Sequence, residues 1–309
     1  MAPKPSPTNA SKWRRLRTEA ENPASRTIDG LSALGIVRVM AADQRRVLVA
    51  VDRERPSIAR AADLVARGFR AGGRIVFIGA GTSGRLGVLE AAELPPTFGI
   101  PPRRAVAIMA GGGEAVGRAR EGVEDDGQAG ANAVRRLRLN RRDVVLGISA
   151  SGVTPFVQSA VAQAKKAGAA VVGITCDPGS PLKGLANIFI VLATGPEVVA
   201  GSTRLKAGTA TKMALNMITT SAMVRAGKTY GNLMVDVQIN SDKLRDRARR
   251  IVSAVTGLTG GAADALLRRA GGSVKVAIVM EKAGLSRAAA VKRIRAAGDS
   301  VRKAVGVRS

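Results

Sequence analysis

Short apolar runs that alternate with helix-like segments between residues 74 and 192 restrict the fold more than any other feature of this sequence. Glycine and turn residues separate the runs from their surroundings, as they do for buried strands. The alternation is typical of a parallel sheet covered by helices on both faces. We expect strands at 74–79, 105–109, 143–149, 170–175 and 187–192. We expect helices at about 83–93, 113–121, 127–138, 154–167 and 206–227.

The two ends of the chain differ from this central region. Residues 1–17 combine Pro, Ser and Lys with an Arg-rich end, and we predict a disordered basic tail there. Apolar residues at helical spacing precede the first strand, so we expect residues 18–240 to form the main domain with N-terminal helices. Residues 241–309 are basic and punctuated by glycine, which predicts a small helical C-terminal subdomain. The expected fold class is α/β, a three-layer sandwich with a mostly parallel sheet.

The residue types that are missing narrow the possible chemistry. The 309 residues include no histidine, which excludes His-dependent triads and most zinc sites. The single cysteine, Cys176, cannot form an intramolecular disulfide, and its apolar strand context is typical of a small core residue. Acid–base chemistry therefore falls to carboxylates, lysine or tyrosine. The acidic cluster at 124–126 lacks histidine partners, so we expect no metal site.

A net charge of +26 raises the question of a nucleic-acid partner. Only 2% of the residues are aromatic, which leaves few surfaces on which single-stranded bases could stack. The basic residues are also spread along the chain. We therefore expect a nucleic acid not to be the main partner, although the positive field attracts anionic substrates. No apolar run is long enough to span a membrane, and none follows Arg14-Arg15, so we expect a cytoplasmic protein.

A glycine-rich loop, residues 79–84, connects the first expected strand to a helix. Free backbone N–H groups and the helix dipole converge at such a turn and bind anions, and the hydroxyls of Thr82 and Ser83 add donors. The glycine spacing also matches a dinucleotide fingerprint, which requires an acidic residue after the next strand. That strand ends in residues 110–113, which contain no carboxylate. The loop therefore predicts a phosphate site, with a plain tight turn as the alternative.

Two further loops after expected strands offer similar side chains. Their hydroxyls and cation belong to Ser149, Ser151, Thr154, Ser202, Thr203 and Lys206. Ligands of open α/β sheets bind outside the carboxyl ends of the strands, where all three loops should meet. Three hydroxyl-rich loops at equivalent positions predict a sugar phosphate as the ligand. Taken alone, Lys206 is more typical of a solvated lysine at a helix start.

Long motifs of the chain resemble the N-acetylmuramic acid 6-phosphate etherase family, whose members have a sugar isomerase (SIS) domain. The motifs are GAGTSGRLGVLEAAELPPTFG at 79–99, EGVEDD at 121–126, GPEVVAGSTRLKAGT at 195–209 and GNLMVD at 231–236. The resemblance runs from about residue 18 to the C-terminus. Departures are few: Leu94 stands where the family usually has Cys, and Glu90 where Asp is common.

The resemblance implies cleavage of the D-lactyl ether of N-acetylmuramate 6-phosphate, giving N-acetylglucosamine 6-phosphate and D-lactate during peptidoglycan recycling. In the family a base removes the C2 proton of the open-chain aldehyde, lactate leaves C3, and water adds to the double bond. Elimination beside a carbonyl needs only a base, an acid and stabilisation of an enolate-like charge. Glu93 and Glu124 match the family's catalytic carboxylates. We assign Glu93 as the acid and Glu124 as the base; no cofactor is implied.

A purely structural role explains one of the two glutamates better than the other. Glu124 precedes an expected helix, whose N-terminus an acidic residue stabilises without any catalytic role. Glu93 lies near an expected helix C-terminus, where the helix dipole disfavours a negative charge. Its position therefore favours a chemical role over a structural one. A sugar-phosphate-sensing regulatory protein and a phosphosugar isomerase on the same fold remain the alternatives. Related SIS domains pair to complete their sites, so the resemblance also implies a homodimer.

Overall fold

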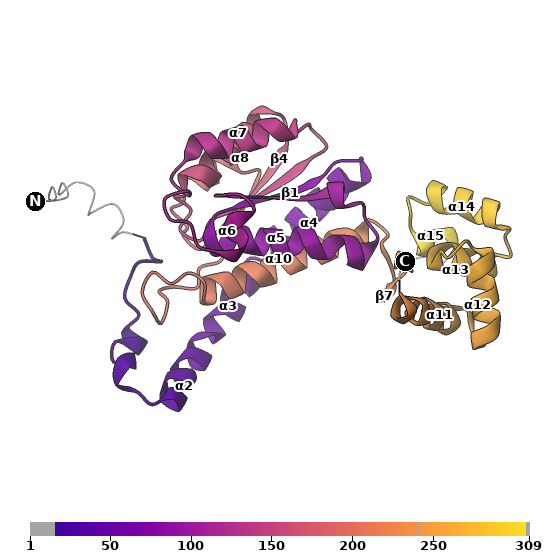
Figure 1. Ribbon diagram of the computed structural model, residues 1–309, viewed down its shortest axis with the longest axis horizontal. Coiled ribbons are helices and arrows are strands. Elements are labelled where there is room, and N and C mark those ends of the chain that lie inside the picture. Colours follow the sequence, from indigo (N-terminus) through magenta and orange to yellow (C-terminus); the bar gives the residue numbers. More distant parts are fainter. Residues whose placement is uncertain (1–15, 240, 307–309) are drawn as a thin grey trace, which may run out of the picture.

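The computed structural model describes residues 16–239 and 241–306, and its centre is a five-stranded parallel sheet (Figure 1). The strand order is β2-β1-β3-β4-β5, and every neighbouring pair is parallel. The strands are β1 (Ile75–Gly79), β2 (Ala105–Met109), β3 (Val144–Ile148), β4 (Ala170–Thr175) and β5 (Ile188–Val191). All five expected strands and the parallel arrangement are confirmed.

Helices cover both faces of the sheet, so the three-layer prediction is also confirmed. Alternate residues of β1 separate the two cores, because Ile75 and Phe77 face one layer while Val76 and Ile78 face the other. The first layer contains α4 (Arg55–Arg70), α5 (Gly81–Phe98) and α10 (Lys206–Arg225). The second contains α7 (Gly127–Leu137), α8 (Pro155–Lys166) and α9 (Leu182–Leu185).

Helix α5 is longer than the sequence indicated. We expected an end near residue 93 because Pro95 and Pro96 follow, but the helix runs to Phe98. Leu94 and Phe98, one turn apart, are both buried in the core, and this packing offsets the hydrogen bonds that the prolines cannot make. Gly99 ends the helix with a φ of 62°.

The helix expected at 113–121 is reduced to α6 (Glu114–Gly117). The Arg85 side chain donates hydrogen bonds to the carbonyl oxygens of Ala115, at 2.8 Å, and Val116, at 2.9 Å. A longer helix would use these two carbonyls as its own acceptors. Arg85 therefore ends α6 and leaves residues 118–124 as an open segment.

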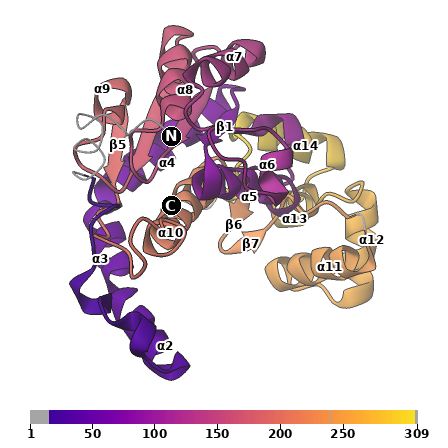
Figure 2. The ribbon, with the colours of Figure 1, turned by 60° about the vertical axis from the view of Figure 1, so that its left-hand side comes forward.

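The N-terminal helices extend away from the sheet, whereas the C-terminal helices form a lobe beside it (Figures 1 and 2). The N-terminal elements are η1 (Pro23–Ser25), η2 (Ile28–Gly30), α2 (Ala33–Asp43) and α3 (Arg45–Arg53), and η3 (Pro102–Arg104) precedes β2. The C-terminal elements are β6 (Thr229–Tyr230), β7 (Leu233–Met234), α11 (Asp242–Thr256), α12 (Gly260–Arg269), α13 (Val274–Ala283), α14 (Arg287–Ala296) and α15 (Val301–Ala304). The lobe has its own apolar core. Most of the tail expected at residues 1–17 lies outside the described residues.

A buried ion pair at the amino ends of β1 and β3 makes stability depend on pH. Burial alone would raise the pKa of Asp143, but hydrogen bonds from the Arg74 side chain and from the backbone N–H groups of Arg74 and Asn140 hold this pKa below its ordinary value. A carboxyl with a lowered pKa in the fold stabilises it above the unfolded pKa, and this contribution disappears as the pH falls through the folded pKa.

Asp143→Asn is therefore expected to be less stable than the wild type at neutral pH, with the difference shrinking below about pH 4. Urea unfolding at a series of pH values measures both effects. The matched control is Asp52→Asn, which removes an exposed carboxylate paired with Arg55. A constant stability difference between Asp143→Asn and wild type across this range would contradict the prediction.

Candidate active site

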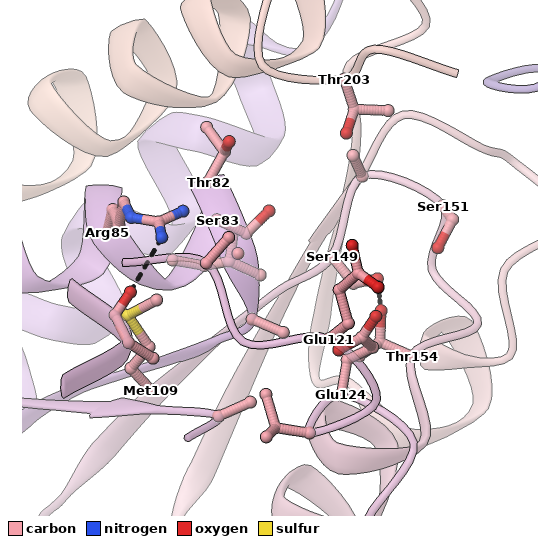
Figure 3. Close-up of a pocket in the computed structure, with 18 of the residues that line it drawn as sticks. Thr82, Ser83, Arg85, Met109, Glu121, Glu124, Ser149, Ser151, Thr154 and Thr203 are labelled. Atoms are coloured by element: carbon pink, nitrogen blue, oxygen red, sulfur yellow. Dashed lines mark hydrogen bonds between the residues drawn. The ribbon is translucent and has the colours of Figure 1, made fainter. Parts of the chain in front are cut away.

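A cavity of about 350 Å³ opens at the carboxyl ends of β1, β2 and β3 (Figure 3). Its wall includes the start of α5, the loops that follow β2 and β3, and the segment before α7. Seven of the ten predicted site residues line it: Thr82, Ser83, Glu124, Ser149, Ser151, Thr154 and Thr203. The parallel sheet thus brings the three hydroxyl-rich loops together.

The first loop forms the N-terminus of α5. Gly79 and Gly84 allow the strand and helix to approach each other, since a Cβ on Gly79 would lie 2.6 Å from the Gly84 nitrogen. Thr82 and Ser83 occupy the first turn of the helix and line the cavity. The N–H groups of that turn have no partners within the helix, and the helix dipole adds positive potential. This end of the cavity is suited to a phosphate group.

The second loop forms the opposite wall, between β3 and α8. The hydroxyls of Ser149 and Thr154 lie 2.8 Å apart and are hydrogen bonded to each other. The Gly152 N–H donates to the Ser149 oxygen at 3.0 Å, and Gly152 has a φ of 73°. Ser149 and Thr154 are therefore held in fixed positions on the cavity wall, where they can donate to or accept from a sugar hydroxyl.

The third loop contributes less than the sequence indicated. Thr203 lines the cavity, whereas Ser202 and Lys206 do not. The Lys206 side chain is only 1% exposed, and its ammonium lies 2.6 Å from the Asp43 carboxylate and 2.7 Å from the Pro196 carbonyl oxygen. Lys206 therefore joins the end of α2 to the start of α10 inside the protein.

Glu197 completes this buried cluster. Its carboxylate accepts hydrogen bonds from the backbone N–H groups of Lys206, at 3.1 Å, and Ala207, at 2.9 Å, which begin α10. Burial raises the pKa of Glu197 above its ordinary value, although those two N–H groups act in the opposite direction. The carboxylate fixes the N-terminus of α10 directly after the third loop.

The two candidate catalytic carboxylates occupy different places. Glu124 lines the cavity, and its carbonyl oxygen accepts a hydrogen bond from the Phe156 N–H at 3.0 Å. The N-cap of α7 is Asp126, whose carboxylate accepts from the Ala129 N–H at 2.8 Å. The capping role that Glu124 was alternatively expected to fill therefore belongs to Asp126.

Glu93 lies outside the cavity, on the exposed side of α5. It lines a second cavity of about 660 Å³ between α5 and α10, together with Glu90, Lys212 and Asn216. Glu90 is buried there and accepts hydrogen bonds from Lys212, at 2.7 Å, and Asn216, at 3.1 Å. Ten residues of α-helix separate Ser83 from Glu93, a rise of about 15 Å. Within one chain, Glu93 and Glu124 belong to separate cavities.

Comparison with known proteins places the chain in a family. It is 52% identical over 264 residues to an N-acetylmuramic acid 6-phosphate etherase of Rubrobacter xylanophilus, covering 85% of this chain and 88% of that protein. Etherases of the same name from Symbiobacterium thermophilum and Rhodopirellula baltica are 50% and 48% identical, covering 88% and 86% of this chain and 90% and 88% of theirs. The chain belongs to the N-acetylmuramic acid 6-phosphate etherase family.

Two family models, both of SIS domains, match the central part of this etherase-family chain. The model of the glucokinase regulatory protein N-terminal SIS domain matches residues 57–166, and the SIS domain model matches residues 127–221. Together the two matches span the parallel sheet and its covering helices. The SIS-type fold expected from the sequence is confirmed.

The cavity of this etherase-family chain also has polar lining residues that were not among the predicted site residues. They are Thr18, Glu19, Arg85, Arg120 and Glu121. Thr18 reaches the cavity because its carbonyl oxygen accepts from the Gly201 N–H at 3.1 Å, which ties the N-terminal segment to the third loop. Arg85 and Glu121 stand inside the motifs at 79–99 and 121–126, which was the available signal. Nothing local in the sequence indicates that residue 18 contacts residue 201.

The single cysteine and the clustering of possible metal ligands were also compared with the expectations for an etherase-family chain. Burial raises the pKa of the Cys176 thiol to about 12, so the thiol stays protonated in the core. Across residues 16–239 and 241–306, no cluster of acidic or thiol side chains could hold a metal ion. No helix in this described part of the chain is long and apolar enough to cross a membrane.

Proposed function

We propose that this protein cleaves the D-lactyl ether of N-acetylmuramate 6-phosphate to N-acetylglucosamine 6-phosphate and D-lactate. The observation that carries the proposal is the identity of about one half to etherases over most of the chain, as for the Rubrobacter xylanophilus protein at 52%. The reaction would take place in the cytoplasm and return cell-wall amino sugars to metabolism.

The cavity supports a specific placement of the substrate. The phosphate binds at the N-terminus of α5, against the N–H groups and the hydroxyls of Thr82 and Ser83. Ser149, Ser151 and Thr154 on the opposite wall then bind sugar hydroxyls, and Thr203 closes a third side. With both ends held, C2 and C3 of the open-chain sugar lie over the middle of the cavity, within reach of the segment that carries Glu124.

The proposed reaction uses two carboxyl groups. Glu124 takes the proton from C2, which is acidic because the neighbouring aldehyde accepts the charge as an enolate. The C3–oxygen bond breaks, and Glu93 gives a proton to the departing lactate oxygen. Water then adds across the C2–C3 double bond, with its hydroxyl on C3 and a proton on C2. The net reaction consumes one water molecule and leaves both carboxyl groups in their starting states.

The separation of Glu93 from Glu124 leads us to infer a homodimer with shared sites. C2 and C3 are bonded to each other, so their acid and base must reach neighbouring atoms. Glu93 stands about 15 Å along α5 from the phosphate loop, beyond the reach of its side chain. We infer that the Glu93 side chain of one subunit enters the cavity that contains Glu124 of the other.

Exposed apolar side chains support a second copy as the partner. On α3, Leu48 and Val49 are 62% and 51% exposed, and with Met213 and Met217 of α10 they line one depression. Leu34 and Val37 on the extended helix α2 are also exposed. Grouped apolar side chains on a surface mark contact sites more often than free surface. Helix α10 contributes both to this depression and to the cavity that contains Glu93.

The purified protein is expected to release D-lactate from N-acetylmuramate 6-phosphate, with N-acetylglucosamine 6-phosphate formed in equal amount. A D-lactate dehydrogenase assay measures the first product, and chromatography measures the second. Ser83→Ala is the binding control: losing a phosphate donor should raise KM more than it lowers kcat. Binding without D-lactate would indicate a sugar-phosphate sensor. Interconversion of aldose and ketose phosphates without D-lactate would indicate an isomerase.

A further inference from the structure

The C-terminal lobe carries far more positive charge for its size than the rest of the protein. Residues 241–306 contain 15 Lys and Arg against 5 Asp and Glu, a net charge of +10 out of the total of +26. Residues 16–239 contain 29 Lys and Arg against 18 Asp and Glu, although this region is more than three times longer. The proposed etherase reaction uses residues of the cavity at the carboxyl ends of the strands. It uses none of the charged residues of the lobe.

The excess is concentrated on α14 and α15. These two helices contain no acidic residue, and their six cations are all exposed: Arg287, Lys292, Arg293, Arg295, Arg302 and Lys303. None of the six forms an ion pair with another described residue. Helix α11 is different, since Asp246 binds Arg249 at 2.6 Å and Arg250 at 2.8 Å. The α14–α15 surface is therefore an uncompensated array of cations.

The fold holds this array in place. Helix α14 follows α13 after a turn at Gly284, which has a φ of 61°, and the Ser286 hydroxyl caps its N-terminus. Ala290 and Ile294 anchor α14 in the core of the lobe. Helix α14 lies at the edge of the lobe (Figure 1), and its four basic residues are exposed. Lys292 and Arg295 are three residues apart on α14 and so neighbours on the helix surface, and like charges at this spacing repel unless an anion binds near them.

We propose that the α14–α15 surface binds the phosphate backbone of double-stranded nucleic acid without sequence preference. A duplex carries one negative charge per about 1.7 Å of axis, and cations that replace its counterions gain affinity by releasing them. The binding surface would give the enzyme a second partner besides its sugar phosphate. The sequence alone did not favour a nucleic-acid partner; the unpaired cations of α14 and α15 are the observation that argues for one besides the sugar phosphate.

The composition of the lobe favours a duplex over other anionic partners. Residues 241–306 contain no Phe, Trp or Tyr, and the one ring beside the array, Tyr230 of β6, is partly buried and lies against Arg302, so single-stranded bases would find few aromatic rings on which to stack. No large apolar side chain is exposed on the described residues of the lobe, which leaves nothing to insert into a membrane or to form the apolar centre of a protein interface. The backbone of a duplex is a regular array of phosphates, and binding it requires neither aromatic rings nor exposed apolar side chains.

The test measures binding of the full-length protein to a fluorescein-labelled duplex of mixed sequence by anisotropy, over a series of salt concentrations. The test variant is Lys292→Ala/Arg293→Ala/Arg295→Ala. The matched control, Arg135→Ala/Arg136→Ala/Lys166→Ala, removes the same charge from exposed positions on α7 and α8. D-lactate release and thermal unfolding of both variants show whether they are folded.

We expect the wild type to bind the duplex with an affinity that falls steeply with salt. The α14 variant should bind about tenfold more weakly at 0.1 M salt, with a salt slope reduced by about 2 to 3, and should keep its enzymatic activity. The control should bind nearly as the wild type does. Equal losses in both variants would mean only general attraction to a positive protein and would overturn the proposal. Tighter binding to vesicles of anionic phospholipid, or to a single strand than to a duplex, would also overturn it.

Discussion

Two inactive variants are expected to regain activity when their subunits are mixed. Glu93→Gln keeps the base Glu124, and Glu124→Gln keeps the acid Glu93. If each site takes Glu93 from one subunit and Glu124 from the other, a mixed dimer has one intact site and one site lacking both carboxylates. Random reassociation makes half of the dimers mixed, so D-lactate release should reach about one quarter of the wild-type rate.

Each variant alone is expected to be nearly inactive. Glutamine has the shape of glutamate but cannot take or give the proton, and general acid–base catalysis contributes typically about 10² to 10⁴-fold. Folding should be unchanged, because Glu93 is exposed and Glu124 forms no side-chain hydrogen bond with another described residue. Recovery on mixing is therefore measured against a background lower by about two to four orders of magnitude.

The decisive measurement refolds or exchanges differently tagged subunits, isolates the mixed dimers by both tags, and assays D-lactate. The isolated mixed dimers have one intact site of two, so they should reach about half of the wild-type rate. The control mixes Glu93→Gln with the double variant Glu93→Gln/Glu124→Gln, which has no Glu93 in either subunit and should stay inactive. Mixed dimers that form but show no recovery would exclude a shared site. Near-normal turnover by either single variant would remove that glutamate from the mechanism altogether.

The same geometry shows what the sequence could and could not predict. The loops at Thr82, Ser149 and Thr203 were predictable as neighbours, because parallel strands deliver their carboxyl ends to one edge of the sheet whatever the details of packing. Glu124 was predictable as a neighbour of these loops, because the segment that carries it comes after β2 and leaves the sheet at the same edge. For Glu93, the helix expected at 83–93 already implied a separation of about 15 Å from the loop. That Glu93 lines a different cavity, together with Lys212 and Asn216 of α10, was not predictable, because no local pattern indicates which helix packs beside α5.

Lys206 illustrates a second kind of limit. Its place directly after a hydroxyl-rich loop suggested either a ligand or a solvated cation, and both are local interpretations. The structure pairs it with Asp43, a residue 163 positions earlier at the end of α2. Burial of a lysine requires such a partner, and no periodicity or spacing near residue 206 indicates one. Non-local ion pairs of this kind become visible only when the helices are packed.

Lys206→Met is expected to destabilise the protein by about 3–5 kcal/mol, because it leaves the Asp43 carboxylate buried without its cation. The side chains of Lys206 and Asp43 are only 1% and 5% exposed, so water cannot replace the lost partner. The double variant Asp43→Leu/Lys206→Met removes both charges and fills their volume, and should recover most of the loss. Urea unfolding at neutral pH measures all three proteins.

This prediction also separates the two roles considered for Lys206. A lysine that held the substrate would, when replaced by methionine, raise KM for N-acetylmuramate 6-phosphate and leave the free energy of unfolding nearly unchanged. If Lys206 instead joins α2 to α10, its replacement should lower the free energy of unfolding and leave KM nearly unchanged in the folded protein. The double variant should then restore stability and activity together. The extended helix α2 carries exposed apolar residues of the inferred dimer contact, so loss of this ion pair should also weaken dimerisation, which analytical ultracentrifugation of Lys206→Met would reveal. Unchanged stability of Lys206→Met with a raised KM would restore Lys206 to the substrate site.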